Sequence, residues 1–150
     1  MPLEAPERYE AGTLSTPAIA GLLAGLGEVK RRGLPSISHH IESLNLRLQN
    51  QLNALSGVTV YVPHHVGSVL LFNIDGMAAD HVGNELNRMG FCVRAGFHCA
   101  ALGHTTLGTP SGGAVRVSPG IFNIRTHIDA FSSAVEMILR HRTISENRSF

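Results

Sequence analysis

The residues best suited to covalent chemistry lie in one short stretch, Arg94–Ala100, which reads Arg-Ala-Gly-Phe-His-Cys-Ala. Cys99 stands there with an arginine and a histidine close by, an electropositive setting that favours the nucleophilic thiolate over the thiol. Arg116 follows seventeen residues after Cys99 within a short apolar run, where a guanidinium can hold a small carboxylate through two parallel hydrogen bonds. The only lysine in the chain, Lys30, lies far from both along the sequence.

Each of these residues also has a structural interpretation. A free cysteine often packs as a small apolar side chain; we expect this for Cys92, on a strand, and weigh it against the nucleophile for Cys99. Arg116 inside an apolar strand needs either a bound ligand or an internal acid, because an unpaired buried charge is costly. The candidate acids are Asp75, Asp80 and Glu85.

Nine histidines raise the question of a metal site. The pairs His39–His40 and His64–His65 lack the i, i+4 spacing of a zinc-binding helix, because adjacent rings point in different directions. His98 and His104 flank Cys99 and could tune its charge, relay a proton or, together with it, hold an ion. Three ligands in one loop with no fourth in view make an ion the weaker interpretation, so we expect no metal.

Length and composition bound the class of protein. The chain has 150 residues, 43% apolar and 15% charged, with a formal net charge of +1. A chain of this length can bury a core and form one compact domain. The charge is too small and dispersed for nucleic acid or an anionic membrane surface. Its two cysteines do not resemble a disulfide framework, and its first residues do not resemble a signal peptide, which favours the cytoplasm.

The spacing of apolar residues predicts alternating helices and strands. A helix from Thr16 to Gly33 carries an apolar stripe and three glycines suited to close packing, and a second helix runs from Ser38 to Gly57. A hairpin follows, with strands at Val58–Val62 and Ser68–Ile74. Downstream we expect a helix at Ala78–Met89, a strand at Phe91–Arg94 and a loop at Ala101–Gly113. A strand at Ala114–Ser118 follows, and then a helix that begins with a capping box at Thr126.

This order of elements predicts an α+β fold, with a mainly antiparallel sheet of three or four strands and helices packed on one face. We expect residues 16–142 to form the domain. Residues 1–15 then represent the remnant of an inter-domain segment, and residues 143–150 a frayed tail.

Four motifs stand in order along the chain: EAGTLSTP (Glu10–Pro17), RAGFHCA (Arg94–Ala100), HTTLGT (His104–Thr109) and VRVSPGIFN (Val115–Asn123). Together they resemble the closing third of class V aminotransferases of the cysteine desulfurase group, over roughly residues 8–140. Three positions depart from the family pattern, which usually has asparagine, proline and threonine there: Ser15, Ala101 and Ile124.

The resemblance implies a fold and a set of roles. The fold would be that of the small domain of fold-type I enzymes that use pyridoxal phosphate (PLP). Cysteine desulfurases turn cysteine into alanine and pass its sulfur to an enzyme cysteine as a persulfide, and Cys99 would be that acceptor. Arg116 would clamp the substrate carboxylate, with Arg94 beside it at the base of the cysteine loop. Thr13 would bind the cofactor phosphate of the neighbouring subunit, which implies a homodimer.

The resemblance also implies that this chain acts with a larger N-terminal domain. The Schiff-base lysine of the family, the histidine before it and the aspartate that pairs with the pyridine nitrogen belong to that domain, whereas Lys30 lies in a polar helix end. We therefore expect the chain to be inactive alone and to deliver sulfur to an acceptor protein. The alternatives are a stand-alone persulfide carrier and an interaction or regulatory module that uses the Thr13 surface; Thr13 could also simply cap a turn.

Overall fold

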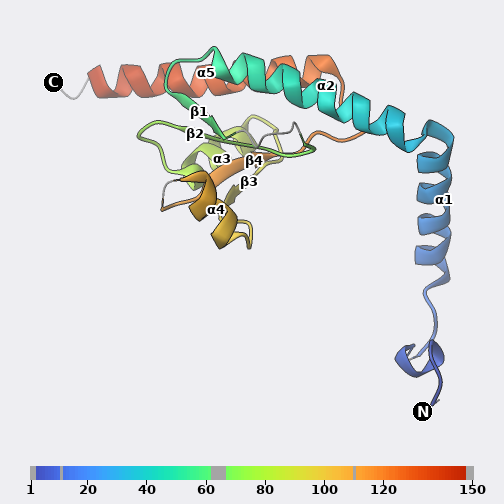
Figure 1. The fold of residues 1–150 in the computed structure, drawn as a ribbon. Helices are drawn as coiled ribbons and strands as arrows, with labels where there is room; N and C mark the ends of the chain where they lie inside the picture. Colours follow the sequence, from blue (N-terminus) through green and yellow to red (C-terminus); the bar gives the residue numbers. More distant parts are fainter. Residues whose placement is uncertain (1–2, 11, 62–66, 110, 148–150) are drawn as a thin grey trace. The chain divides into compact units, whose positions relative to one another are not determined.

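A computed structural model describes residues 3–10, 12–61, 67–109 and 111–147 of the chain. The chain divides into two compact units, Met1–Ile37 and Ser38–Phe150. The first unit holds a short 3-10 turn, η1 (Glu7–Tyr9), the helix α1 (Thr16–Arg32) and the first turn of α2 (Leu34–Asn53) (Figure 1). Among the described helices, none combines the length and the apolarity needed to cross a bilayer.

Helix α1 forms for local reasons. Pro17 lies in its first turn, where a missing N–H breaks no helical hydrogen bond, and Gly33 ends it with a φ of 80°, which glycine adopts easily. No residue of α1 is buried, and its apolar stripe is at least 53% exposed at Ile19, Leu22, Leu23 and Leu26. Its three glycines have nothing within 4 Å of the place a Cβ would take. Among the described residues of its own unit, none packs closely against these glycines.

The second unit is built on a four-stranded sheet in the order β1-β2-β4-β3, in which every pair is antiparallel. Its strands are β1 (Val58–Tyr61), β2 (Leu70–Ile74), β3 (Arg94–Gly96) and β4 (Ala114–Val117). The predicted hairpin is confirmed, with Val58 opposite Ile74. Its expected turn, with Val62 and the His64–His65 pair, lies outside the described residues.

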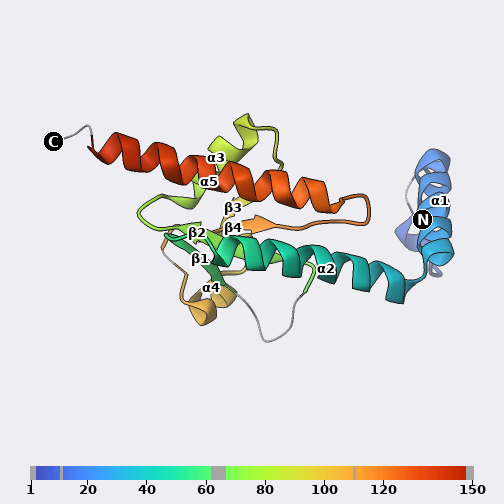
Figure 2. The ribbon, with the colours of Figure 1, turned by 90° about the horizontal axis from the view of Figure 1, so that it is seen from above.

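Three helices cover one face of this sheet: α2, α3 (Ala79–Arg88) and α5 (Arg125–Asn147). In Figures 1 and 2, α2 and α5 lie side by side along the sheet. Phe131 of α5 packs edge-on against Phe72 and Phe91, at ring separations of 6.1 and 5.3 Å. Leucines at helical spacing in α2 complete this core and are at most 1% exposed: Leu44, Leu48 and Leu52. The predicted α+β fold with helices on one face is confirmed.

Part of the segment expected to be a loop, Ala101–Gly113, is helical: α4 spans Ala101–Leu107. The hydroxyls of Thr105 and Thr106 donate to carbonyls four residues earlier, so both threonines satisfy their polar groups within the helix. Gly108 then ends the helix in a left-handed conformation. The segment that we expected to be a loop, because it is rich in glycine and threonine, therefore begins with a short helix.

Several element boundaries also differ from the sequence-based expectation, and three of them bear on the prediction. Helix α2 begins at Leu34 rather than Ser38, because Pro35 falls in the first turn, where proline is tolerated. Helix α5 begins at Arg125, so Thr126 lies inside the helix and does not cap it. Strand β3 begins at Arg94, where the predicted strand ends.

Candidate active site

Two arginines stand directly opposite each other where β3 pairs with β4. Arg94 is the partner of Arg116 in the antiparallel register, and Arg116 is also the partner of Leu71 on β2. Side chains alternate between the faces of a sheet, and the adjacent Phe72 and Val115 belong to the buried core. Arg94 and Arg116 therefore lie on the face away from the core helices, where Arg94 is exposed and Arg116 partly buried.

Within the described part of the chain, no hydrogen bond or ion pair joins either arginine to a carboxylate. Of the acids considered for Arg116, Glu85 pairs with Arg88, and Asp80 accepts a bond from the next backbone amide. Asp75 accepts a bond from a threonine hydroxyl on β1. Like charges directly opposite in a sheet repel, so this pair is a favourable place for an anionic ligand.

Cys99 lies in a tight turn that follows β3. The amide of Ala100 donates to the carbonyl of Phe97 at 2.9 Å, and the two residues between, His98 and Cys99, have φ values of 53° and 59°. Positive φ at both central positions is the pattern of a type I′ turn, which usually holds asparagine or glycine because a side chain is strained there. Cys99 is exposed and forms no disulfide, so it does not pack in the core.

His98 ties this turn to β4. Its Nε2 lies 3.1 Å from the carbonyl oxygen of Ala114, so it is the protonated nitrogen that donates. Its other nitrogen, Nδ1, is buried with no hydrogen-bond partner among the described residues. Burial is the main cause that lowers the pKa of His98, the bond to Ala114 raises it, and the nearby charges of Arg116, His104 and Arg94 lower it further.

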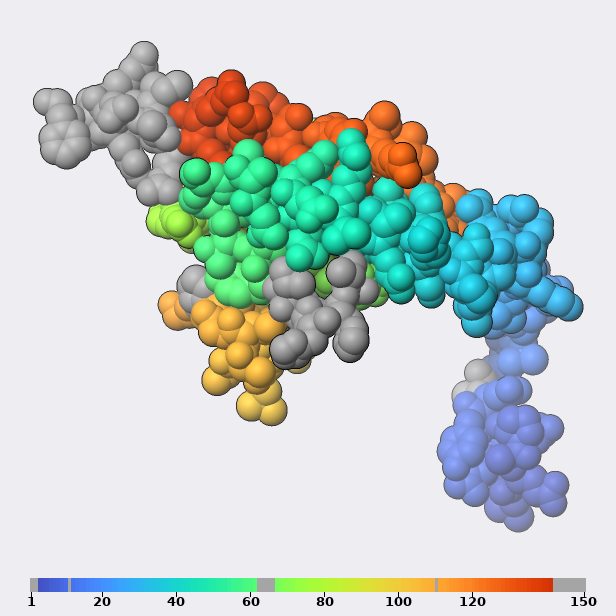
Figure 3. All heavy atoms as spheres, turned by 45° about the horizontal axis from the view of Figure 1, so that its top comes forward, coloured from blue at the N-terminus to red at the C-terminus, as the bar shows by residue number. Residues whose placement is uncertain are grey.

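His104 holds α4 against the same turn. It is only 4% exposed, and its Nδ1 lies 2.8 Å from the hydroxyl oxygen of Thr109. Its ring contacts the rings of Phe97 and His98, with centres 5.3 and 5.7 Å apart. Helix α4 is part of the yellow and orange projection in Figure 3. The structure therefore brings together the rings of His98 and His104, with Cys99 next to His98 along the chain. No group of three metal-ligating side chains is found in the described ranges.

Two residues that the sequence did not single out also shape this site. A Cβ on Gly113 would lie 2.3 Å from the carbonyl carbon and oxygen of Gly96, so β3 and β4 touch backbone to backbone there. Asn73 is buried and donates to the carbonyl of Gly113 at 3.1 Å. Two features of the sequence could have identified these residues: Asn73 is a polar residue inside an apolar strand, and Gly113 belongs to a glycine pair directly before a strand.

Thr13 and Lys30 belong to the first unit, whereas the other candidate residues belong to the second. Both are exposed. Lys30 stands in a charged helix end, where Arg31 and Arg32 bind Glu28 and lower the pKa of that carboxyl to about 2. These charged neighbours agree with the solvated helix end that the sequence indicated for Lys30.

Cys92 is not the buried strand residue expected from the sequence. It is exposed, and it precedes β3 in an irregular segment. The pairing of β3 with β4 begins only at Arg94, and a cavity of about 480 Å³ adjoins the unpaired ends, lined in part by Cys92, Val93, Val117 and His127. Cys92 and Cys99 therefore lie beyond opposite ends of the same short strand.

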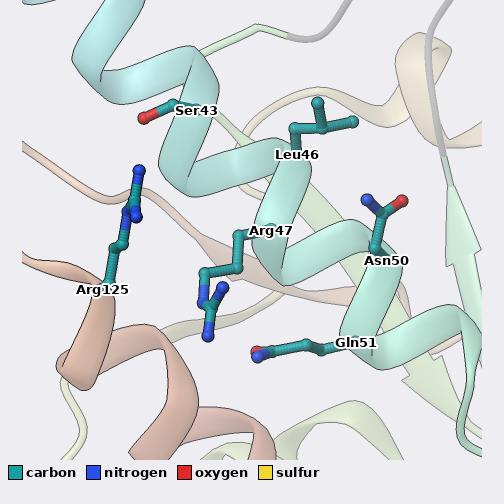
Figure 4. A pocket seen from close by; sticks show the side chains of 6 residues that line it. All are labelled: Ser43, Leu46, Arg47, Asn50, Gln51 and Arg125. Atoms are coloured by element: carbon teal, nitrogen blue, oxygen red, sulfur yellow. The ribbon is translucent and has the colours of Figure 1, made fainter.

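A second hollow, of about 410 Å³, lies between α2 and the start of α5 (Figure 4). The guanidinium of Arg47 beside it makes two hydrogen bonds to Asp129, at 2.7 and 3.0 Å, and Gln51 makes a third. These bonds lower the pKa of Asp129. Since Arg47 is already engaged, these contacts join two helices and do not form a ligand site.

Comparisons with known proteins place the chain in a family. The family model for aminotransferase class V matches residues 3–131. A probable cysteine desulfurase of Halobacterium salinarum is 35% identical over 136 residues, which cover 87% of this chain and 32% of that protein. A cysteine desulfurase of Escherichia coli is 33% identical over 137 residues, which cover 91% of this chain and 33% of that protein.

Solved structures agree with the sequence relatives. The apo structure of the cysteine desulfurase of Thermococcus onnurineus matches with a TM-score of 0.80 and 31% identity, covering 91% of this chain and 34% of that one. An Escherichia coli cysteine desulfurase structure matches with the same TM-score at 26% identity, covering 91% and 34%. The chain spans about a third of the length of the curated relatives it matches. The chain belongs to the aminotransferase class V family, and the relatives and structures it resembles are cysteine desulfurases.

Proposed function

We propose that this chain supplies the sulfur-accepting and substrate-binding part of a PLP-dependent cysteine desulfurase. Cys99 takes the sulfur as a persulfide, and Arg116, with Arg94 beside it, binds the substrate carboxylate. The observation that carries this proposal is the arginine pair. Two guanidiniums stand opposite each other without a carboxylate partner among the described residues, and the strand that carries Arg94 leads directly to an exposed thiol.

The residues of this chain can perform two tasks for such a reaction. A guanidinium binds a carboxylate with two parallel bonds, which fixes the orientation of the substrate. The exposed thiol of Cys99 supplies the nucleophile, because a cysteine attacks sulfur as its thiolate. An exposed turn also allows the thiol to receive sulfur at one site and present it to an acceptor protein.

The family implies PLP, which in a complete enzyme acts as the electron sink for bond cleavage at the substrate. This chain does not provide the covalent site for that cofactor, because its only lysine, Lys30, is exposed on α1 and belongs to the other unit from Cys99. We propose that a separate N-terminal domain holds the cofactor and that Thr13 contributes to the phosphate site of the neighbouring subunit in a homodimer. The two free thiols fit a reducing cytoplasm.

Sulfur loading tests the role of Cys99 directly. The purified chain is treated with a small-molecule persulfide, and intact and peptide masses are measured. The Cys99 thiolate bonds to the outer sulfur of the donor, the donor sulfur–sulfur bond breaks, and its inner sulfur leaves as a thiolate. We expect a gain of one sulfur atom on Cys99 that Cys99→Ser abolishes and the matched Cys92→Ser variant retains. Loading that follows Cys92 instead would contradict the proposal.

A chimera tests the carboxylate site. The last third of the Escherichia coli relative is replaced by this chain, and production of alanine from cysteine is measured. We expect activity that Cys99→Ser removes. Arg116→Ala should raise KM for cysteine more than Arg88→Ala, a matched change of a surface arginine already paired with Glu85. An unchanged KM in the Arg116→Ala chimera would refute the proposed carboxylate site. A chain that loads sulfur but never supports turnover in the chimera would indicate a stand-alone carrier.

A further inference from the structure

The turn that carries Cys99 is strained, and something must hold it. His98 and Cys99 both have positive φ, a conformation that costs a residue with a side chain free energy and persists only where its surroundings enforce it. The bond within the turn, from Ala100 to Phe97, closes it but does not attach it to the sheet. The bond from His98 to the carbonyl of Ala114 does make that attachment, because Ala114 belongs to β4.

The tautomer of His98 follows from this bond. A carbonyl oxygen only accepts, so the proton must be on Nε2, and a neutral ring then carries a lone pair on Nδ1. Nδ1 is buried and receives no hydrogen bond among the described residues, from the thiol of Cys99 included. A second proton on the ring would therefore create a buried donor without an acceptor.

The surroundings of His98 also oppose a charged ring. Burial is the largest cause that lowers the pKa of His98, and the charges of Arg116 on β4, His104 on α4 and Arg94 on β3 lower it further, whereas the bond to the Ala114 carbonyl raises it. Since the net effect depresses the folded pKa, the neutral ring is favoured above the ordinary value of 6.5, and the advantage is lost as pH falls through the lower folded value.

We propose that His98 is a positioning residue that acts as a neutral hydrogen-bond tether between the cysteine turn and β4, and that it is not the charged partner of the Cys99 thiolate. His98 then keeps the turn that carries Cys99 at a fixed place relative to β4, the strand of Arg116. The purpose of the tether rests on the proposed function, but the hydrogen bond and the conformation of the turn are properties of this chain alone.

Substitutions at position 98 separate a tether from a charged partner. Glutamine places an amide N–H near the position of Nε2 and cannot titrate, whereas alanine has no side-chain donor. In a Cys92→Ser background we expect His98→Gln to leave the pH midpoint of Cys99 alkylation unchanged. His98→Ala should speed amide hydrogen exchange in Phe97–Ala100 by roughly two- to tenfold relative to His98→Gln, the effect of one hydrogen bond on an opening equilibrium.

Nuclear magnetic resonance of the imidazole nitrogens gives a second readout. We expect His98 to show a protonated Nε2 and a bare Nδ1 from pH 8 down to its titration, with exchange in the turn rising as the ring gains a proton. A protonated Nδ1 at neutral pH, or a thiol midpoint that His98→Gln raises by about one pH unit or more, would establish a charged partner and overturn the tether.

The two proposals can fail separately. If sulfur loads on Cys99 while His98→Ala leaves exchange in the turn unchanged, the tether is wrong and the proposed function stands. If the His98 variants behave as expected but Cys99 takes no sulfur, the tether stands and the proposed function is wrong.

Discussion

The Gly113→Ala substitution tests whether the contact between two glycines sets the geometry of the site. A Cβ at position 113 would lie 2.3 Å from the carbonyl carbon and oxygen of Gly96 and 2.9 Å from its Cα, at a φ of +77°. The obstacle is backbone, so no side-chain rotation can relieve the overlap. Strand β3 has to move away from β4, and the cysteine turn follows β3 along the chain.

Two costs add in this variant. A left-handed conformation costs a residue with a side chain about 1–2 kcal/mol, and forcing extra atoms into a packed site costs about 1–3 kcal/mol more. We therefore expect a loss of about 2–5 kcal/mol in the free energy of unfolding.

The chain offers two matched controls. Gly108 has a φ of +66° but nothing within 4 Å of its Cβ position, so Gly108→Ala should show only the conformational cost. Gly112 has neither feature, and Gly112→Ala should change stability by no more than about 0.5–1 kcal/mol.

Urea unfolding of the three variants, followed by circular dichroism, gives the free energies. Hydrogen exchange over Arg94–Ala100 reports whether β3 has separated from β4 locally. Equal stabilities for the Gly113 and Gly108 variants, with unchanged exchange in this segment, would refute the claim that backbone contact fixes the strand pair.

Three further changes test the rest of the structure. Phe131→Ala should destabilise the second unit by about 3–5 kcal/mol in thermal or urea unfolding, because a buried ring that touches two others is lost. Asp129→Asn should cause a small loss of stability at neutral pH that shrinks as pH falls below 3.8, since Arg47 holds the pKa of Asp129 below that value and the benefit disappears once the carboxyl is protonated; unfolding curves at several pH values measure it. Leu22→Gln on α1 should change the free energy of unfolding by no more than about 0.5 kcal/mol and reduce any concentration-dependent association seen by sedimentation, because this side chain is 65% exposed.

The sequence predicts those elements whose burial follows a local period. The leucines of α2 at spacings of four identify both the type of element and its buried face, and the apolar run of β2 identifies a strand. The hairpin and the α+β class follow from these patterns. Helix α4 is missed because its sequence, Ala-Leu-Gly-His-Thr-Thr-Leu, has glycine and threonine and little periodicity. Its stabilising contact, the bond between His104 and Thr109, becomes visible only in three dimensions.

The cysteines show a different limit of sequence reasoning. Cys92 lies in an apolar stretch, Phe-Cys-Val, that is typical of a buried strand. In the structure the strand begins later, at Arg94, because pairing with β4 is confined to Arg94–Gly96. The close approach of Gly96 and Gly113 belongs to this pairing and joins residues far apart in sequence. The exposure of Cys92 therefore depends on a non-local register, which no local pattern contains.

Strand β4 positions several groups of the candidate site. Strand β4 carries Arg116, offers the Ala114 carbonyl to His98 and follows directly on Gly113, whose carbonyl binds Asn73. Because side chains alternate along a strand, a shift of register by one residue would send the arginine into the core and bring Val115 to the open face. The burial of Val115, which is 0% exposed, opposes that shift. The same apolar contact that stabilises the fold thus keeps the guanidinium of Arg116 on the face of the sheet away from the core helices.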